Sequence, residues 1–327
     1  MKNFLKLFLR KLLSYAITLC LLVTFIFFII RITPGDPAAK YISPQFNKEL
    51  ADNVRASYNL NEPLLSQFGA FLGNALSGNF GISYEYHQPV FSVVKNYLLF
   101  TVLFALTSFL IQFAAGTGIA LYVTKRRGSR FEKIFDSLSL AVYSLPTFLI
   151  GVILVYIFSI KLNIFPSSDL YSPDFSSKSI FEKIFEIISH SILPLLTLSI
   201  PGIVIFYRYA KENLTAALNK SFVTYLRSNG MGEKEIYRKH ILPNIMPQLI
   251  SLSAVELSIL LSGALITEVI FNLPGMGRVT VTAIMQRDYP LIVATTFLAG
   301  VFVLACNFAG EILRGIIDRR IAEEIFQ

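Results

Sequence analysis

Residues 222–247 read FVTYLRSNGMGEKEIYRKHILPNIMP and lie between two runs that are apolar enough to cross a membrane. The bordering runs cover residues 187–207 and 249–271, and only Glu256 and Glu268 interrupt the second one. Hydrocarbon satisfies neither charged side chains nor irregular backbone, so a polar stretch between two spans has to project into water. The flanking spans therefore indicate a membrane protein with a polar projection.

Composition supports this class for the whole chain. Of its 327 residues, 54% are hydrophobic and only 15% are charged, and the mean hydropathy is +0.59. Soluble domains have about 25% charged residues, so the chain is expected to be an integral membrane protein. The two cysteines, Cys20 and Cys306, both lie within apolar runs, and we expect no disulfide between them.

Six apolar runs can cross the hydrocarbon core, which is roughly 30 Å thick and takes about 20 helical residues. They cover residues 12–30, 96–124, 137–160, 187–207, 249–271 and 289–310. We therefore predict an all-α protein with six transmembrane helices and both termini on one side. The first run exceeds the apolar core of a signal peptide, about 7–15 residues, and no A-x-A site follows it, which favours a retained anchor.

The basic residues predict which side carries the termini. Most of the 29 Lys and Arg residues fall in four segments, at 2–11, 125–133, 208–239 and 314–320. Loops rich in Lys and Arg stay in the cytoplasm, so we expect both termini and residues 222–247 to be cytoplasmic. Since all four segments flank spans, the net charge of +8 indicates contact with a lipid bilayer and not with nucleic acid.

This topology divides the chain into three segments. Residues 1–35 form a cytoplasmic arm and the first anchor, residues 36–95 an external helical region, and residues 96–327 a core of five further spans. Pro34, Gly35 and Asp36 are expected to end the first span in a sharp turn. Leu and Phe at helical spacing between residues 45 and 81 predict two short amphipathic helices, whereas the external loop at 161–186 is expected to be irregular.

The sequence contains no motif for catalysis. ATP hydrolysis by this chain would need a GxxxxGK[ST] phosphate loop, and no Gly-Lys pair occurs. His87, His190 and His240 do not have metal-ligand spacing. We therefore expect neither an enzyme nor a metal site.

Two carboxylates inside an apolar run are the candidates for a polar site within the membrane. Glu256 and Glu268 would lie about 18 Å apart along a straight helix and about 120° apart around it, so they do not form a pair. Ionisable residues in spans usually face a bundle interior or water. Glu256 is our candidate for lining a pathway, whereas Glu268 is interpreted as an interface residue near the outer end.

The polar segment itself is expected to be two short helices joined by an elbow. Residues 224–229 and 233–240 can be helical, Gly230 and Gly232 permit a change of direction, and a turn at Leu242 and Pro243 leads into the next span. Such a projection is either a solvated loop or a docking element for a soluble partner.

The spacing from Gly230 to Leu242–Pro243 resembles the EAA loop of permease subunits in ATP-binding-cassette (ABC) importers. That signature has Glu-Ala-Ala, three residues, Gly, nine residues, Ile, one residue and Leu-Pro. Here Thr224, Tyr225 and Leu226 replace Glu-Ala-Ala, and His240 replaces Ile. This departure resembles the branch of the family that handles peptides and nickel.

Further stretches resemble the B-type permease of oligopeptide and dipeptide importers, in the expected order along the whole chain. They are RITPGDPA from residue 31, LNEPLLSQF from 60, SGNFGISY from 77, SLPTFLIGVILVYIFSIKLNIFP from 144, HSILPLLTLSI from 190 and EVIFNLPGMGRVTVTAIMQRDYPLI from 268. The tail departs from the family, with IIDRRI where an Asp-Pro-Arg is common.

The resemblance implies a type I ABC importer permease in the inner (cytoplasmic) membrane of a prokaryote. Its implied partners are a second, C-type permease, two ATPase subunits that bind ATP and Mg, and an extracytoplasmic substrate-binding protein, with no cofactor on this chain. The ATPase-coupling residues, within an EAA-type loop at 222–243, would be Thr224, Tyr225, Leu226, Arg227, Gly230, Met231, Glu233, Glu235 and Ile236. Of these, Tyr225, Leu226, Met231 and Ile236 would be buried against an ATPase, with the charged residues around them.

Peptides are the favoured substrate, with nickel or a nickel chelate as the alternative within the family. A secondary transporter is the rival from a different class. It would be expected to show inverted repeats or interrupted helices around charges at the membrane midplane, and neither pattern is evident in the sequence.

Overall fold

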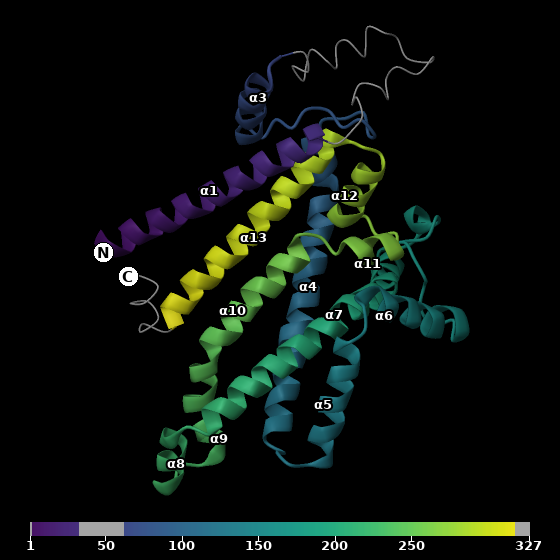
Figure 1. Cartoon of the computed structure of the whole chain (residues 1–327). Coiled ribbons are helices and arrows are strands. Elements are labelled where there is room, and N and C mark those ends of the chain that lie inside the picture. Colours follow the sequence, from purple (N-terminus) through teal and green to yellow (C-terminus); the bar gives the residue numbers. More distant parts are fainter. Residues whose placement is uncertain (1, 33–61, 318–327) are drawn as a thin grey trace. The chain divides into compact units, whose positions relative to one another are not determined.

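The computed structural model describes residues 2–32 and 62–317, which form helices joined by turns (Figure 1). The all-α prediction is therefore confirmed. Pro34, Gly35 and Asp36, together with the first of the two expected external helices, lie outside the described residues. The chain forms two compact units, one from residues 1–99 with 279–301 and one from residues 100–278 with 302–327.

The first unit contains α1 (Lys2–Ile32), α3 (Leu64–Leu76) and the first half of α13 (Tyr289–Ile317). Phe27 of α1 packs against Phe68 and Phe71 of α3, with ring centroids 5.3 and 5.2 Å apart. The buried Asp288 begins α13 by accepting the Leu291 N–H at 3.2 Å, and it also accepts the Ser83 hydroxyl. Helix α3 confirms the second expected amphipathic helix.

In the second unit, the predicted span at 137–160 is not one helix. Helix α5 (Arg130–Tyr143) and the helix formed by α6 (Thr147–Leu154) with η2 (Val155–Lys161) meet at an angle of 103°. Pro146 lies at the break, and a proline both lacks an N–H and disfavours helical geometry in the preceding residue. The described residues thus include five helices that could span a membrane, or six if the bent pair is one span.

Helices α4 (Val90–Thr124) and α7 (Ile180–Leu218) cross at close range within the second unit (Figure 1). A Cβ on Gly116 of α4 would lie 2.5 Å from Phe206 of α7, and one on Gly202 of α7 would lie 2.2 Å from Gln112 of α4. The Gln112 amide donates to Ser108 Oγ at 3.0 Å and to the Leu198 carbonyl at 3.2 Å. The hydrophobic effect does not drive helices together in lipid, which is as apolar as their side chains. Close packing at small residues and hydrogen bonds between helices stabilise the contact instead.

The predicted span at 249–271 is also interrupted. Helix α10 (Leu242–Leu261) ends before Gly263, which has a φ of +109°, and the short α11 (Leu265–Ile270) follows. A turn then leads into α12 (Met276–Met285). This break places Glu256 and Glu268 on different helices.

Candidate coupling segment and intramembrane carboxylates

Helix α8 (Ser221–Ser228) opens the coupling segment, which we define as residues 222–243. Its Val223 is fully buried and packs in a core cluster with Leu214 of α7 and with Ile236 and Ile241. Thr224, Tyr225 and Arg227 are exposed, and Tyr225, which lies on the side of the helix opposite Val223, is 67% accessible. The helix therefore attaches one side to its own subunit and leaves an aromatic side chain on the other.

The elbow at Gly230 is a helix-ending turn with a complete set of hydrogen bonds. The Met231 N–H donates to the Leu226 carbonyl at 3.2 Å, and the Gly230 N–H donates to the Arg227 carbonyl at 3.0 Å. This is a Schellman motif, in which the Gly position adopts a positive φ, here +75°. A Cβ at Gly230 would meet nothing within 4 Å, so backbone conformation and not space requires the glycine.

An ion pair joins the two sides of the elbow. The Arg227 guanidinium donates to both carboxylate oxygens of Glu233, at 2.6 and 3.2 Å, and this contact raises the pKa of Arg227. Glu235 forms a second pair, with Lys239 at 2.7 Å. Both pairs are exposed, and such pairs contribute about 0–1 kcal/mol. They orient the elbow more than they stabilise it.

The structure corrects the predicted set of apolar residues that would contact an ATPase. Helix α9 (Glu233–Glu235) continues into a π-helical stretch, η4 (Ile236–Ile241), whose Ile236 is fully buried in the subunit's own core and so cannot contact an ATPase. Leu226 and Met231 are partly buried against the same core. Of the four predicted apolar contacts, only Tyr225 is openly exposed.

The turn predicted at Leu242 and Pro243 is also wrong. Ile241 and Leu242 keep helical backbone angles, so η4 passes directly into α10. A proline normally clashes with the carbonyl four residues earlier, whereas the wider π-helical turn before Pro243 bonds to the fifth residue back. The π-helical stretch allows the proline to lie in a continuous helix.

Glu256 lies on α10, is half-buried, and among the described residues receives no hydrogen bond and forms no ion pair. A carboxylate without an internal partner in an apolar helix needs water, a partner subunit or a cargo group for solvation. This arrangement is compatible with the predicted pathway role, which stays a prediction.

Glu268 differs from the prediction of an interface residue, because it is fully buried. Its Oε1 accepts the Thr101 hydroxyl of α4 at 3.1 Å, and its Oε2 accepts the Arg278 N–H in the first turn of α12 at 3.0 Å. Thr101 Oγ1 in turn accepts the Met276 N–H at 2.8 Å. The carboxylate thus connects α4, α11 and the start of α12.

Two glycines make room for this carboxylate. A Cβ on Gly275 would lie 2.2 Å from the Glu268 Cδ, and one on Gly277 would lie 2.9 Å from its Oε2. The LPGMG stretch after Glu268 was a signal in the sequence, since clustered glycines often mark a close approach. The prediction of one continuous span over residues 249–271 did not take this signal into account.

A cluster of charged side chains connects α5 to α7, in addition to the hydrogen bonds between α4 and α7. The Lys211 ammonium of α7 lies 2.7 Å from Glu132 and 2.6 Å from Asp136 of α5. Asp136 also accepts the Tyr207 hydroxyl at 2.7 Å. Helix α7, which leads directly into α8, is therefore connected to both α4 and α5.

Two family models match the chain in succession. Residues 113–323 match the binding-protein-dependent transport system inner membrane component, and residues 4–107 match the N-terminal part of such membrane components. The chain belongs to this family. It is a multi-pass permease subunit of the inner membrane and not an enzyme, and it works with other components of an ABC importer.

Relatives of known name align over almost the whole chain. A putative peptide permease of Brucella suis is 32% identical over 92% of this chain and 93% of the relative. A dipeptide transport system permease of Lactococcus lactis is 27% identical over 97% and 99% of the two chains. A glutathione transport system permease of Escherichia coli is 26% identical over 94% and 96%.

A solved structure shows the same fold. The inward-facing MetNI methionine ABC transporter superimposes with a TM-score of 0.54 at 15% identity, over 70% of this chain and 97% of the compared one. The predicted type I ABC importer permease fold is therefore confirmed.

Proposed function

We propose that this permease subunit forms the translocation pathway for peptides. The names of three full-length relatives, which handle peptides, dipeptides and glutathione, support this substrate class. The test is uptake of labelled di- and tripeptides by a host that lacks its own peptide importers and produces this chain with its cognate components. Peptide uptake that depends on the chain is expected. Uptake of radioactive nickel without uptake of any peptide would overturn the substrate class.

The proposed complex contains a second, C-type permease, two ATPase subunits that bind ATP and Mg, and an extracytoplasmic substrate-binding protein. In this complex the exposed side of α8 would contact an ATPase, with Tyr225 as the central anchor and Arg227, Glu233 and Glu235 around it. The observation that carries this proposal is that one side of α8 is buried and the other is exposed. Val223 of α8 packs with Ile236 and with residues of α7 and α10, while Tyr225 remains accessible on the opposite side. A displacement of α8 would then tilt both long helices together.

Replacement of Tyr225 by Ala tests the coupling role. A few aromatic anchors carry most of the energy of an interface, at about 2 kcal/mol or more each, and every 1.4 kcal/mol corresponds to about a tenfold change in affinity. We expect peptide uptake and ATPase stimulation to fall at least about tenfold, while membrane insertion is unchanged. Ser228→Ala, on the same helix, is the control and should transport normally. Normal transport by Tyr225→Ala would exclude α8 as the contact.

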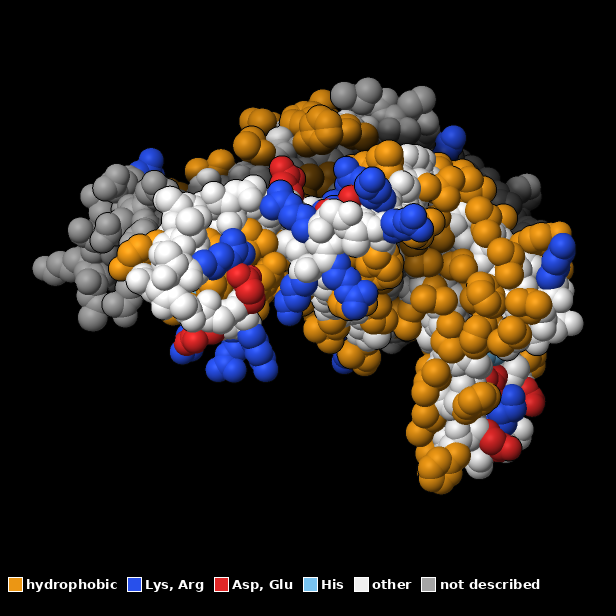
Figure 2. All heavy atoms as spheres, turned by 90° about the horizontal axis from the view of Figure 1, so that it is seen from below, with side chains coloured by type: hydrophobic (Ala, Val, Ile, Leu, Met, Phe, Trp, Pro, Cys, Tyr) orange, Lys and Arg blue, Asp and Glu red, His pale blue; other side chains and the backbone are white. Residues whose placement is uncertain are grey.

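We propose further that both termini and the coupling segment lie in the cytoplasm. Figure 2 shows Lys and Arg side chains gathered on the face seen from below. Arg127 of the loop after α4 donates to Asn219 at the α7–α8 junction at 3.1 Å, so two basic loops lie at the same end of these helices. This clustering is what the positive-inside rule predicts for a cytoplasmic face.

Cysteine labelling of intact cells tests the orientation. In a variant without Cys20 and Cys306, a cysteine at Asn219 should be protected from an impermeant thiol reagent. A cysteine at the exposed Ser176, in the loop before α7, should react. Labelling at Asn219 together with protection at Ser176 would reverse the topology.

A further inference from the structure

The beginning of α7 and the loop before it form an arm, which we define as residues 168–188. One side of its helix carries five exposed apolar side chains, with Phe181 86% and Phe185 74% accessible, together with Ile180, Ile184 and Ile188. Their spacing of one, three and four positions places them on one side of a helix. Given that an aromatic side chain covers about 150–250 Å², the two phenylalanines alone expose roughly 240–400 Å².

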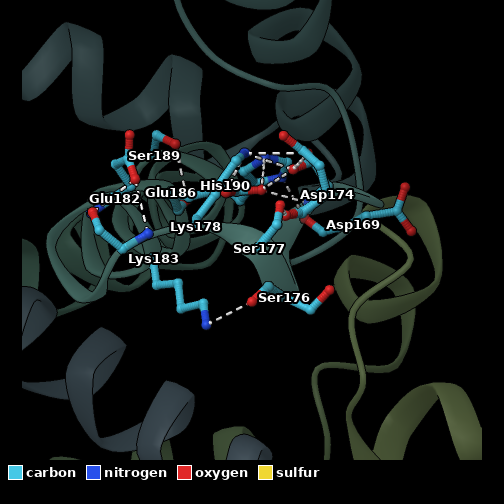
Figure 3. Close-up of polar contacts among 12 residues, drawn as sticks. Asp169, Asp174, Ser176, Ser177, Lys178, Glu182, Lys183, Glu186, Ser189 and His190 are labelled. Carbon is cyan, nitrogen blue, oxygen red and sulfur yellow. Dashed lines mark hydrogen bonds and ion pairs between the residues drawn. The ribbon is translucent and has the colours of Figure 1, made fainter.

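The charged groups of the arm are turned toward its loop and are paired there (Figure 3). Glu186 accepts the Lys178 ammonium at 2.6 Å and the Ser172 N–H at 2.5 Å. The Glu182 carboxylate completes a capping box with Ser179, and Lys183 donates to the Ser176 carbonyl at 3.1 Å. In Figure 2 the arm lies at the lower right, with hydrophobic side chains along one side and charged ones along the other.

Several contacts connect the helix of the arm to its loop. The Glu186 carboxylate raises the pKa of Lys178, while the Ser172 hydroxyl and Lys178 lower the pKa of Asp174, so both groups keep their charges at neutral pH. His190 Nδ1 lies 3.1 and 3.0 Å from the carbonyl oxygens of Ser168 and Asp169, and because carbonyls only accept, this nitrogen donates. The arm is a preformed amphipathic element with its polar side already satisfied.

Helix α7 is longer than a membrane span requires. Its 39 residues extend about 58 Å at about 1.5 Å per residue, whereas the hydrocarbon core is roughly 30 Å thick. The charged residues from Arg208 onward lead toward the coupling segment on one side of the membrane. The remaining 180–207 stretch still exceeds the hydrocarbon core by about 12 Å, roughly eight residues. The excess corresponds to the arm.

We propose that the apolar side of the arm is inserted into the lipid surface of the leaflet opposite the coupling segment. The occupant is lipid because the apolar side continues along the same helix, through Ile188 to the exposed Leu196, into the part that spans the bilayer. An amphipathic helix at such a surface buries its apolar side about 5–10 Å into the boundary between headgroups and acyl chains. The paired charges of the loop then face water, and the arm fixes the height and tilt of α7.

The chain contains no tryptophan, so a single introduced indole reports on this surface without background. The full chain carrying Phe181→Trp is reconstituted in vesicles of phosphatidylethanolamine and phosphatidylglycerol, with and without brominated acyl chains. Ser176→Trp, in the exposed loop of the same arm, is the matched control. We expect bromolipid to quench Phe181→Trp several-fold more than the control, and aqueous iodide to quench the control several-fold more.

Two results would overturn the proposal. Stronger quenching of Phe181→Trp by iodide than by bromolipid would place the face in water. Protection from both quenchers would place it against protein, such as a second permease subunit. Phe185→Trp repeats the test if the first variant does not fold, and none of these readouts depends on transport or on its substrate.

Discussion

The elbow at Gly230 and the turn around Gly275 and Gly277 use glycine for different physical reasons. At Gly230 there is open space, and the positive φ requires the residue, whereas the space at Gly275 is filled by the Glu268 carboxylate. The turn around Glu268 satisfies its polar groups internally, through Thr101 and the N–H of Arg278. The elbow instead leaves Tyr225 exposed next to a rigid attachment. The comparison shows two kinds of region. Around Glu268 the polar groups are hydrogen-bonded within the subunit, whereas the elbow has an exposed aromatic surface that is suited to a partner.

Removal of the Glu268 carboxylate should have the largest effect on stability. Glu268→Ala leaves the Arg278 N–H and the Thr101 hydroxyl buried without their acceptor, at about 1–3 kcal/mol for each group, and it also leaves a cavity. We expect a loss on the order of 3 kcal/mol or more, measured by thermal unfolding of the solubilised chain. Glu268→Gln keeps the side chain's shape and one acceptor oxygen, so it should lose less. If the Ala variant were as stable as the unchanged protein, the hydrogen bonds of Glu268 within the subunit would not contribute to its stability.

Filling the space at Gly275 should have the next largest effect. Gly275→Ala introduces a Cβ where the Glu268 Cδ lies only 2.2 Å away, and overpacking of this kind costs about 1–3 kcal/mol. Gly232→Ala is the matched control, because its Cβ meets nothing within 4 Å and its φ is −69°. If both substitutions shifted the unfolding temperature equally, space would not be what distinguishes the two regions.

Straining the elbow should cost less stability but more activity. Gly230→Ala forces an alanine into left-handed geometry at about 1–2 kcal/mol, and relief of this strain would change the angle between α8 and α9. We expect normal insertion into the membrane and a loss of substrate-stimulated ATP hydrolysis by the assembled complex. Retained stimulation in reconstituted vesicles would show that the elbow angle does not matter for coupling.

The smallest effect should come from the ion pair across the elbow. Glu233→Gln removes the charge that pairs with Arg227, and both side chains are largely exposed, at 45% for Arg227 and 59% for Glu233. Exposed pairs contribute about 0–1 kcal/mol and weaken as salt increases. The difference in unfolding temperature should therefore be small at low salt and vanish at high salt. A large, salt-independent loss would mean that the pair is essential to the elbow.

The two intramembrane carboxylates show why part of the site was predictable and part was not. The sequence places both glutamates in apolar surroundings, and that alone marked them as costly residues. The prediction for Glu268 was wrong because its partners, Thr101 and the N–H of Arg278, come from α4 and α12. Ile236 was misassigned for the same reason, since its neighbours include Leu214 of α7. Sequence spacing gives the side of a helix but not what packs against that side.

The sequence by itself determined the membrane class, the helical architecture, the family and the change of direction at Gly230. These features depend on local properties: the length of apolar runs, motif spacing and the φ range open to glycine. Only the tertiary structure decided that Pro146 breaks a span, that Pro243 does not, and that Glu268 is buried with internal partners. The burial of Glu268 depends on hydrogen bonds and space that residues distant in sequence supply. The effect of each proline depends on the backbone geometry that the fold adopts around it, which is a break at Pro146 and a π-helical stretch before Pro243.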